Sequence, residues 1–263
     1  MKQKISLVLG SGGARGITQI GVIKLLEERE LEIDEIVGCS IGSLVGAAYA
    51  AGKVGLLGDW MSKLTKRDVF RLLDFSNPRY GLLKGMRVLD TLHEVFGDVN
   101  IEDLPIKYTA VATDLRNDRE VLIREGSIYQ AIRASIAIPA VFTGIDLKDR
   151  YLVDGGVLNP VPVNHVQNKT NIIVAVNLDG RPDATSAKVF GKLNAIALLQ
   201  ESYYAMRRRL SEMSLELYKP DYTVHIPHNM AGIWDFPRSA ELIKKGHELA
   251  KDAIPNDLLK KYG

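Results

Sequence analysis

The stretch IVGCSIGSLVGAAYAAG, from Ile36 to Gly52, contains no charged residue and places Ser40 between two glycines. Such a stretch can be a short membrane segment, a buried core helix or a sharp turn that presents a serine. It is shorter than the roughly 20 residues that a membrane-spanning helix needs, and it carries four glycines and two serines. The membrane interpretation is therefore rejected, whereas a core helix and a serine turn are compatible with each other.

The turn follows the pattern Gly-x-Ser-x-Gly, with Gly38 and Gly42 on either side of Ser40. This pattern indicates a nucleophile only where it joins a strand to a helix. Apolar residues up to Val37 predict the strand, and small residues from Ile41 predict the helix. Side chains at the two glycine positions would collide in so sharp a turn, and the helix N-terminus favours the negative charge that develops during acyl transfer. A plain tight turn before a buried helix is the alternative.

Strand and helix patterns alternate along the rest of the chain. Strands are predicted at Ile5–Leu9, Ile33–Val37, Tyr108–Thr113, Glu120–Ile123, Tyr151–Val153, Ile172–Val176 and Tyr222–Ile226. Helices are predicted near Ile17–Arg29, Ile41–Ala51, Arg87–Phe96, Ser127–Ser135, Ala187–Leu217 and Ser239–Ala250. Strands separated by helices predict a three-layer α/β fold, with a mostly parallel central sheet and helices on both faces. No linker or repeat divides the chain, so residues 1–263 are predicted to form a single domain.

The composition is that of an ordinary globular protein, with 46% hydrophobic and 25% charged residues. The formal net charge of +2 gives no global attraction to nucleic acid. The single cysteine, Cys39, excludes an internal disulfide and is expected to be a small buried side chain rather than the nucleophile. The apolar run Ile5–Leu9 is too short for a secretory signal, so we expect a cytoplasmic protein.

A glycine-rich loop, GSGGARG at residues 10–16, follows the first predicted strand and opens the first helix. A dinucleotide site would require glycine at position 15, where this chain has Arg15. A nucleotide site therefore stays a weaker alternative, beside a plain glycine turn. The third interpretation is an oxyanion hole, because glycine amides can turn toward a tetrahedral intermediate without side chains in the way. Arg15 could fix the loop or meet an anionic head group.

An acidic partner for Ser40 is found in Asp154, which follows the predicted strand Tyr151–Val153 and precedes Gly155 and Gly156. A carboxylate at the end of a strand can reach a site at the edge of a parallel sheet, although Asp-Gly is also a common turn. The five histidines all read better as structural or solvated residues: His93, His165, His225, His228 and His247. The sequence therefore favours a Ser–Asp dyad over a triad, and burial would have to raise the pKa of the aspartate for it to act as a base.

These pieces, in this order, resemble the patatin-like phospholipases. The glycine loop with its arginine, the serine turn and the Asp-Gly-Gly segment carry the resemblance, together with Ser135–Pro139, which has the family's S-x-A-x-P pattern. The resemblance implies a patatin-like α/β fold and hydrolysis of a lipid or ester substrate with no metal or other cofactor. It implies that Ser40 is the nucleophile, that Asp154 is the base, and that amides of Gly12, Gly13 and Ala14 form the oxyanion hole. The supporting positions that it implies are Gly10, Arg15, Gly16, Gly38, Gly42, Gly155 and Gly156. Gly10-Ser11 stands where many relatives have Asp-Gly, which leaves backbone donation intact.

Apolar and basic residues mix between Trp60 and Met86. The segment is either a basic, apolar cap over the site, in transient contact with an anionic membrane surface, or an ordinary amphipathic helix packed on the core. The Arg207–Arg209 cluster is expected to be a solvated helix face rather than a nucleic-acid patch. Two other functions stay open, a nucleotide-binding protein and a non-catalytic regulatory protein on the same fold. Acyl transfer to an alcohol is a variant of the leading interpretation, and the oligomeric state is not encoded in these patterns.

Overall fold

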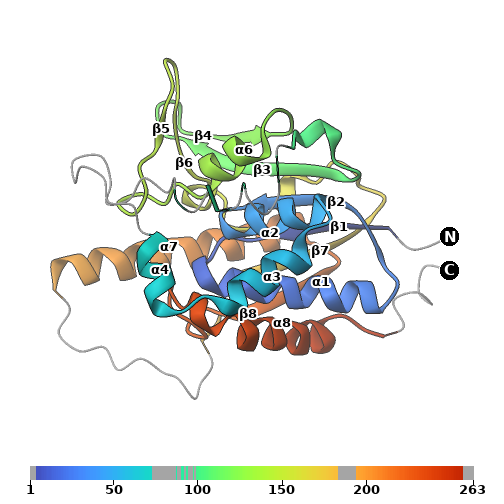
Figure 1. The fold of residues 1–263 in the computed structure, drawn as a ribbon. Coiled ribbons are helices and arrows are strands. Elements are labelled where there is room, and N and C mark those ends of the chain that lie inside the picture. Colours follow the sequence, from blue (N-terminus) through green and yellow to red (C-terminus); the bar gives the residue numbers. More distant parts are fainter. Residues whose placement is uncertain are drawn as a thin grey trace.

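A computed structural model of the chain describes residues 4–72, 87, 90, 91, 93, 97, 99–182 and 194–256. Its centre is an eight-stranded sheet with helices on both faces (Figure 1), which confirms the predicted α/β class. The strands are β1 (Lys4–Leu9), β2 (Glu32–Cys39), β3 (Lys107–Asp114), β4 (Arg119–Ile123), β5 (Ile145–Asp146), β6 (Tyr151–Asp154), β7 (Ile172–Gly180) and β8 (Tyr222–Pro227).

The helices also follow the predicted pattern where the structure describes them. They are α1 (Thr18–Glu28), α2 (Ile41–Ala50), α3 (Val54–Lys63), α4 (Lys66–Leu72), α6 (Ile128–Ser135), α7 (Ala195–Tyr218) and α8 (Ser239–Ala253). Short 3₁₀ turns are η1 (Gly13–Ile17), η2 (Ile101–Asp103), η3 (Gly155–Val157), η4 (Val163–His165) and η6 (Phe236–Arg238). Most of the helix predicted at residues 87–96, and residues 187–193 of the long predicted helix, lie outside the described residues.

The main path of the sheet runs β5-β6-β3-β2-β1-β7-β8, with β4 paired to β3 off this path. Five neighbouring strands, β3-β2-β1-β7-β8, are parallel. The antiparallel pairs are β3-β4, β3-β6 and β5-β6, and they lie at the end of the sheet that contains β5 and β6. The central sheet is thus mostly parallel, with an antiparallel extension that the strand patterns did not specify.

The central strand β1 explains the three layers, because it is buried on both faces and its side chains alternate between two cores. Ile5, Leu7 and Leu9 pack in the larger cluster, with side chains of α1, α2 and α8. Val8 points the other way, into a smaller cluster that includes Val161 and borders α7. Figure 1 accordingly shows α7 apart from the layer that contains α1, α2 and α8.

The pairing of β3 decides where the loops that follow β2 and β6 meet. β4 pairs with Ala110–Asp114, so it occupies one edge of β3 over that length. β2 and β6 must therefore share the opposite edge: β2 is paired as far as Val111, and β6 is paired from Ala112. Because β2 is parallel to β3 and β6 antiparallel, their carboxyl ends face each other at adjacent positions. Cys39 lies opposite Val111, and Asp154 lies opposite Ala112.

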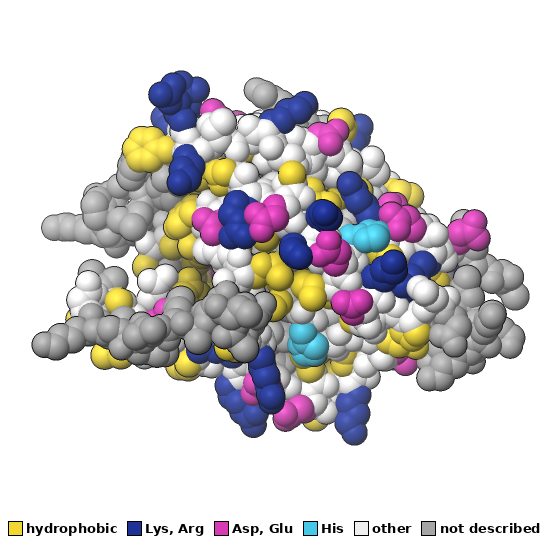
Figure 2. Space-filling view, turned by 90° about the horizontal axis from the view of Figure 1, so that it is seen from below, with side chains coloured by type: hydrophobic (Ala, Val, Ile, Leu, Met, Phe, Trp, Pro, Cys, Tyr) yellow, Lys and Arg dark blue, Asp and Glu magenta, His cyan; other side chains and the backbone are white. Residues whose placement is uncertain are grey.

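The surface that faces the viewer in Figure 2, on the side of α8, mixes acidic and basic side chains without a large field of either sign. This agrees with the small net charge of +2. In the part of the chain that the structure describes, no helix is both long enough and apolar enough to cross a membrane.

Candidate active site

Ser40 occupies a strained turn between the end of β2 and the start of α2. Its backbone angles are φ 57° and ψ −127°, a region that L-residues adopt at a cost of about 1–3 kcal/mol. A Cβ at Gly38 would lie 2.5 Å from the carbonyl oxygen of Gly42, and a Cβ at Gly42 would lie 2.1 Å from that of Leu9. Both glycines are therefore required by backbone contacts, as the sharp turn predicted.

The hydroxyl of Ser40 meets the carboxylate of Asp154 across the facing ends of β2 and β6. Ser40 Oγ donates a hydrogen bond to Asp154 Oδ2 at 2.5 Å. The other carboxylate oxygen, Oδ1, accepts the amide of Gly156 at 2.7 Å. Both side chains are buried, and the structure thus brings together the two residues singled out in the sequence.

Burial raises the pKa of the Asp154 carboxyl above its ordinary value. The hydrogen bond from Ser40, the positive charge of Arg207 and the amide of Gly156 act in the opposite direction. A carboxylate that is desolvated but supported in this way is a stronger base than an exposed aspartate, which suits proton removal from a hydroxyl.

Ser135, at the end of α6, holds the backbone of the serine turn in place. We did not predict this role from the S-x-A-x-P pattern. Its Oγ accepts the backbone amide of Ser40 at 2.9 Å and donates to the carbonyl of Val111 at 2.6 Å. Ser135 therefore ties the strained residue to β3. Because the amide of Ser40 is occupied, donors for a developing oxyanion must come from elsewhere.

The glycine loop supplies two such amides. Within the described part of the chain, the amides of Gly12 and Gly13 have no hydrogen-bond acceptor, and Gly13 lines the same cavity as Ser40. The amide of Ala14 differs from the expectation, because it donates to the carbonyl of Ile233 at 3.1 Å. Ala14 thus has no free amide to offer, and the loop donors that remain are those of the two glycines.

The remaining glycines allow close backbone packing around these donors. A Cβ at Gly10 would lie 2.7 Å from the carbonyl of Val176, and a Cβ at Gly16 would lie 2.2 Å from Ile41. The two glycines after Asp154 are equally confined. A Cβ at Gly155 would lie 2.3 Å from the carbonyl of Val111, and one at Gly156 would lie 2.6 Å from Ser11 Oγ.

Arg15 fixes the loop from its far end, which is one of the two roles considered for it. It is buried and donates from Nε to the carbonyl of Leu178 at 3.1 Å and from Nη1 to that of Ala231 at 3.2 Å. Its Nη2 lies 3.6 Å from Asp179.

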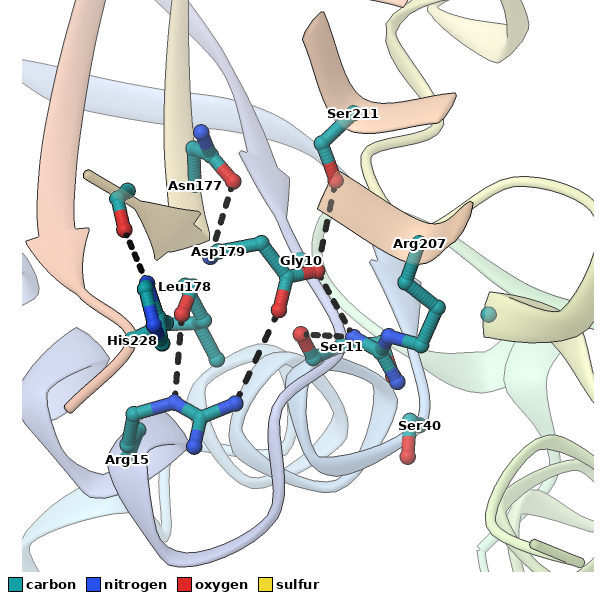
Figure 3. Close-up of polar contacts among 12 residues, drawn as sticks. Gly10, Ser11, Arg15, Ser40, Asn177, Leu178, Asp179, Arg207, Ser211 and His228 are labelled. Carbon is teal, nitrogen blue, oxygen red and sulfur yellow. Dashed lines mark hydrogen bonds and ion pairs between the residues drawn. The ribbon is translucent and has the colours of Figure 1, made fainter. Parts of the chain in front are cut away.

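Figure 3 shows that the same aspartate also accepts a hydrogen bond from Arg207 of α7. Arg207 is buried, so the expectation of a solvated face at Arg207–Arg209 is wrong for its first member.

An apolar cavity opens beside Ser40. Its volume is about 100 Å³, and apart from Ser40 and Gly13 its lining is entirely hydrophobic. The lining side chains come from α2, from α3 and the segment after it, and from the loops after α6 and β8: Ile41, Leu44, Trp60, Met61, Leu64, Val69, Ile136, Ile138, Phe142, Ile233, Trp234 and Phe236. Such a cavity suits a hydrocarbon chain rather than a charged group.

The other candidate nucleophile and bases lie elsewhere. Burial raises the pKa of the Cys39 thiol well above its ordinary value, so this side chain is neutral. Among the described residues, no histidine is hydrogen-bonded to Ser40 or Asp154. His165, the histidine nearest Asp154 in sequence, is bonded to Glu120 at 2.6 Å instead. The described residues also contain no group of three His, Cys, Asp or Glu side chains arranged to hold a metal ion.

A protein-family model described as patatin-like phospholipase matches residues 7–166 of the chain. An uncharacterised NTE family protein of Mycobacterium tuberculosis is 44% identical over 178 residues, a match that covers 67% of this chain and 49% of that protein. The protein named neuropathy target esterase sws of Drosophila persimilis is 37% identical over 165 residues, covering 60% of this chain and 11% of that protein. The chain spans about half the length of the first of these relatives and far less of the second.

Among solved structures, VipD from Legionella pneumophila aligns with a TM-score of 0.50 at 13% sequence identity. The alignment covers 95% of this chain and 66% of that chain. At this identity the likeness concerns the fold alone.

Proposed function

The chain belongs to the patatin-like phospholipase family, and from this membership and the site geometry we propose that it is a serine-dependent lipid acyl hydrolase. The observation that carries the proposal is the hydrogen bond from Ser40 Oγ to the buried Asp154 carboxylate, with Ser40 in the lining of a hydrophobic cavity. In this proposal Ser40 is the nucleophile, Asp154 is the general base, and the amides of Gly12 and Gly13 form the oxyanion hole.

The first half of the reaction forms an acyl-enzyme. Asp154 takes the proton from Ser40 Oγ while that oxygen attacks the ester carbonyl carbon. The carbonyl electrons move to the oxygen, whose negative charge the amides of Gly12 and Gly13 stabilise, helped by the N-terminus of α2. The intermediate collapses, the C–O bond to the alcohol breaks, and the departing alcohol takes the proton from Asp154.

The second half regenerates the enzyme with water. Asp154 takes a proton from water as the water oxygen attacks the acyl carbon. Collapse of this second intermediate releases the fatty acid and returns the proton to Ser40 Oγ. An alcohol in place of water would give acyl transfer through the same steps.

The lipid class of the substrate follows from the cavity. A hydrocarbon chain gains about 0.8 kcal/mol for each CH₂ group that it buries, and the hydrophobic lining offers no partner for a charged acyl tail. We therefore propose esters with an aliphatic acyl chain as substrates.

The segment from α3 to α4 is the part of the predicted cap that the structure describes. Met61 is buried in the core and also lines the cavity, as do Trp60, Leu64 and Val69, so this segment packs on the body of the protein and forms a wall of the cavity. We propose that this segment contacts an anionic membrane surface transiently. The contact would be made by Phe70, which is 62% exposed, and by the exposed basic side chains Lys63, Lys66, Arg67 and Arg71. Residues 73–86 of the predicted cap lie outside the described residues.

Liposome flotation tests the membrane contact. Wild-type protein should float with vesicles that contain anionic lipid and should be released by high salt, whereas Arg67→Glu should reduce flotation several-fold. Lys251→Glu on α8 is the matched control and should float like wild type. Equal flotation of both variants would contradict the contact.

An ester panel tests the proposed function itself. The purified protein should hydrolyse p-nitrophenyl esters of fatty acids and lysophospholipids, and Ser40→Ala or Asp154→Asn should each lower kcat by about 1,000-fold or more. Ser202→Ala, an exposed serine on α7, is the control and should keep wild-type rates. A wild-type protein that is inert on every ester, or a Ser40→Ala variant that retains full activity, would refute the assignment.

A further inference from the structure

The buried side chain of Arg207 contacts the glycine loop directly. Its Nη2 donates to the backbone carbonyl of Ser11 at 2.8 Å, and its Nη1 donates to Ser11 Oγ at 3.0 Å. Ser11 is the residue immediately before Gly12, and Figure 3 shows the guanidinium group of Arg207 alongside it. Arg207 belongs to α7, which lies outside residues 7–166 matched by the family model.

The contact with the Ser11 carbonyl has a consequence for the next amide. The carbonyl of Ser11 and the N–H of Gly12 belong to one planar, trans peptide unit, and they point in opposite directions. A bond that fixes the carbonyl therefore fixes the direction of the Gly12 N–H as well. Glycine allows many backbone conformations, so without this bond the peptide could rotate freely enough to misdirect the amide.

Arg207 is itself held by a carboxylate that also holds the far end of the loop. Asp179, near the end of β7, accepts from Arg207 Nη2 at 2.9 Å and from Ser211 Oγ at 3.3 Å. Its other oxygen lies 3.6 Å from Arg15 Nη2. Asp179 thus connects two arginines. Arg207 is hydrogen-bonded to Ser11, the residue before Gly12, and Arg15 lies two residues after Gly13.

We propose that Arg207 is a positioning residue that orients the Gly12 amide toward the oxyanion by holding the Ser11 carbonyl, with Asp179 as its anchor. The inference rests on the proposed acyl hydrolase function, because an oxyanion hole matters only if an ester carbonyl is attacked. The arrangement requires arginine, since the guanidinium group serves Ser11 and Asp179 at once from a fixed, planar set of donors.

A second effect of Arg207 supports this role. Its positive charge lowers the pKa of Asp154 against the effect of burial. Two titratable side chains of the described residues that interact with this carboxylate, Cys39 and Tyr203, are neutral, because burial raises the pKa of the thiol well above its ordinary value and that of the phenol to about 12. Loss of the arginine should therefore leave Asp154 protonated up to a higher pH.

Steady-state kinetics of Arg207→Met and Arg207→Lys test the inference, with Arg209→Met as the control on the exposed side of the same helix. Removal of one oxyanion donor costs about 10²–10³ in kcat in other serine hydrolases, and a misdirected donor should cost part of that. We expect Arg207→Met to lower kcat about 10–100-fold with KM within about threefold, and to move the acidic limb of the pH profile upward. Arg207→Lys should restore part of kcat and most of the pH profile, because it keeps the charge.

Variants on the partners keep the test valid if Arg207→Met does not fold. Asp179→Asn should lower kcat in the same way as Arg207→Lys, because it releases the anchor. Ser11→Ala should cost less than either, because the backbone carbonyl stays in place. Near-wild-type kcat in both Arg207→Lys and Asp179→Asn, or a loss confined to KM, would overturn the inference. An inert wild-type protein would instead refute the proposed function on which the inference rests.

Discussion

At the scale of single residues, the proposed reacting groups are Ser40 and Asp154, and side chains from other elements hold them in place. Ser40 and Asp154 stand out because glycines flank them at the ends of predicted strands, and they are hydrogen-bonded in the structure although 114 residues separate them. Ser135 and Arg207 do not stand out. Three consecutive arginines predict a solvated face, and only the rotation of α7 on the sheet decides that the first is buried while Arg209 is exposed.

The pH dependence of the proposed reaction should follow from Asp154. Because burial raises its pKa, the carboxylate becomes protonated at a higher pH than an exposed aspartate and can then no longer accept the proton of Ser40. The rate of ester hydrolysis should therefore fall as pH decreases, with a midpoint above the ordinary aspartate value. Stopped-assay rates between pH 3 and pH 8 measure this, and a rate that stays flat down to the ordinary value would count against Asp154 as the base.

The same shift has a consequence for stability. A carboxyl whose pKa is higher in the folded state favours folding when protonated, and this contribution is lost as pH rises through the folded-state pKa. At neutral pH, Asp154→Asn should therefore raise Tm relative to wild type, and the difference should shrink in acid. Calorimetry at pH 7 and pH 4 tests this, and a variant that melts below wild type at pH 7 would show that the charged form stabilises the fold.

At the scale of elements, the alternating pattern predicts a parallel sheet correctly, but strand direction at its end is not encoded. Tyr151–Asp154 reads as a short strand in either direction, because side-chain alternation is the same for parallel and antiparallel pairing. Its antiparallel pairing with β3 is what turns the carboxyl end of β6 toward that of β2. The site therefore depends on a topological detail that only tertiary structure supplies.

The contact between α1 and α8 provides a test of packing at this scale. A Cβ at Gly21 would lie 2.0 Å from the carbonyl of Ile243, so the two helix backbones touch. Gly21→Ala should lower the free energy of unfolding by about 1–3 kcal/mol, as overpacking does. Gly55→Ala in α3 is the control, because nothing lies within 4 Å of its added Cβ, and it should be neutral or slightly stabilising. Urea unfolding compares the two, and equal stabilities would contradict the close packing.

At the scale of the whole molecule, the hydrophobic cavity is assembled from segments that no local pattern connects. Its walls come from α2 and α3 and from the loops after α6 and β8, where Phe142 and Trp234 bring their ring centroids within 6.5 Å. The sequence predicts an apolar segment near Trp60 but not the residues around Ile233 that complete the cavity. The site and its cavity therefore depend on contacts between segments that lie far apart in the sequence.

Acyl-chain preference should follow from the width of this cavity. Leu64→Trp adds volume to the cavity wall, so it should lower kcat/KM about tenfold for a decanoate ester and leave an acetate ester nearly unchanged. Leu56→Trp is the control, because Leu56 is 52% exposed and lies outside the cavity. A series of p-nitrophenyl esters measures the effect, and a uniform loss over all chain lengths would argue against the cavity as the acyl site.

The most direct measurement is the location of a covalent adduct. A fluorophosphonate probe reacts with an activated serine, and digestion followed by mass spectrometry identifies the modified residue. We predict a single adduct on Ser40 in the wild-type protein and none in Ser40→Ala or Asp154→Asn. An adduct on another serine, with Ser40 unmodified in a protein that hydrolyses esters, would contradict the account.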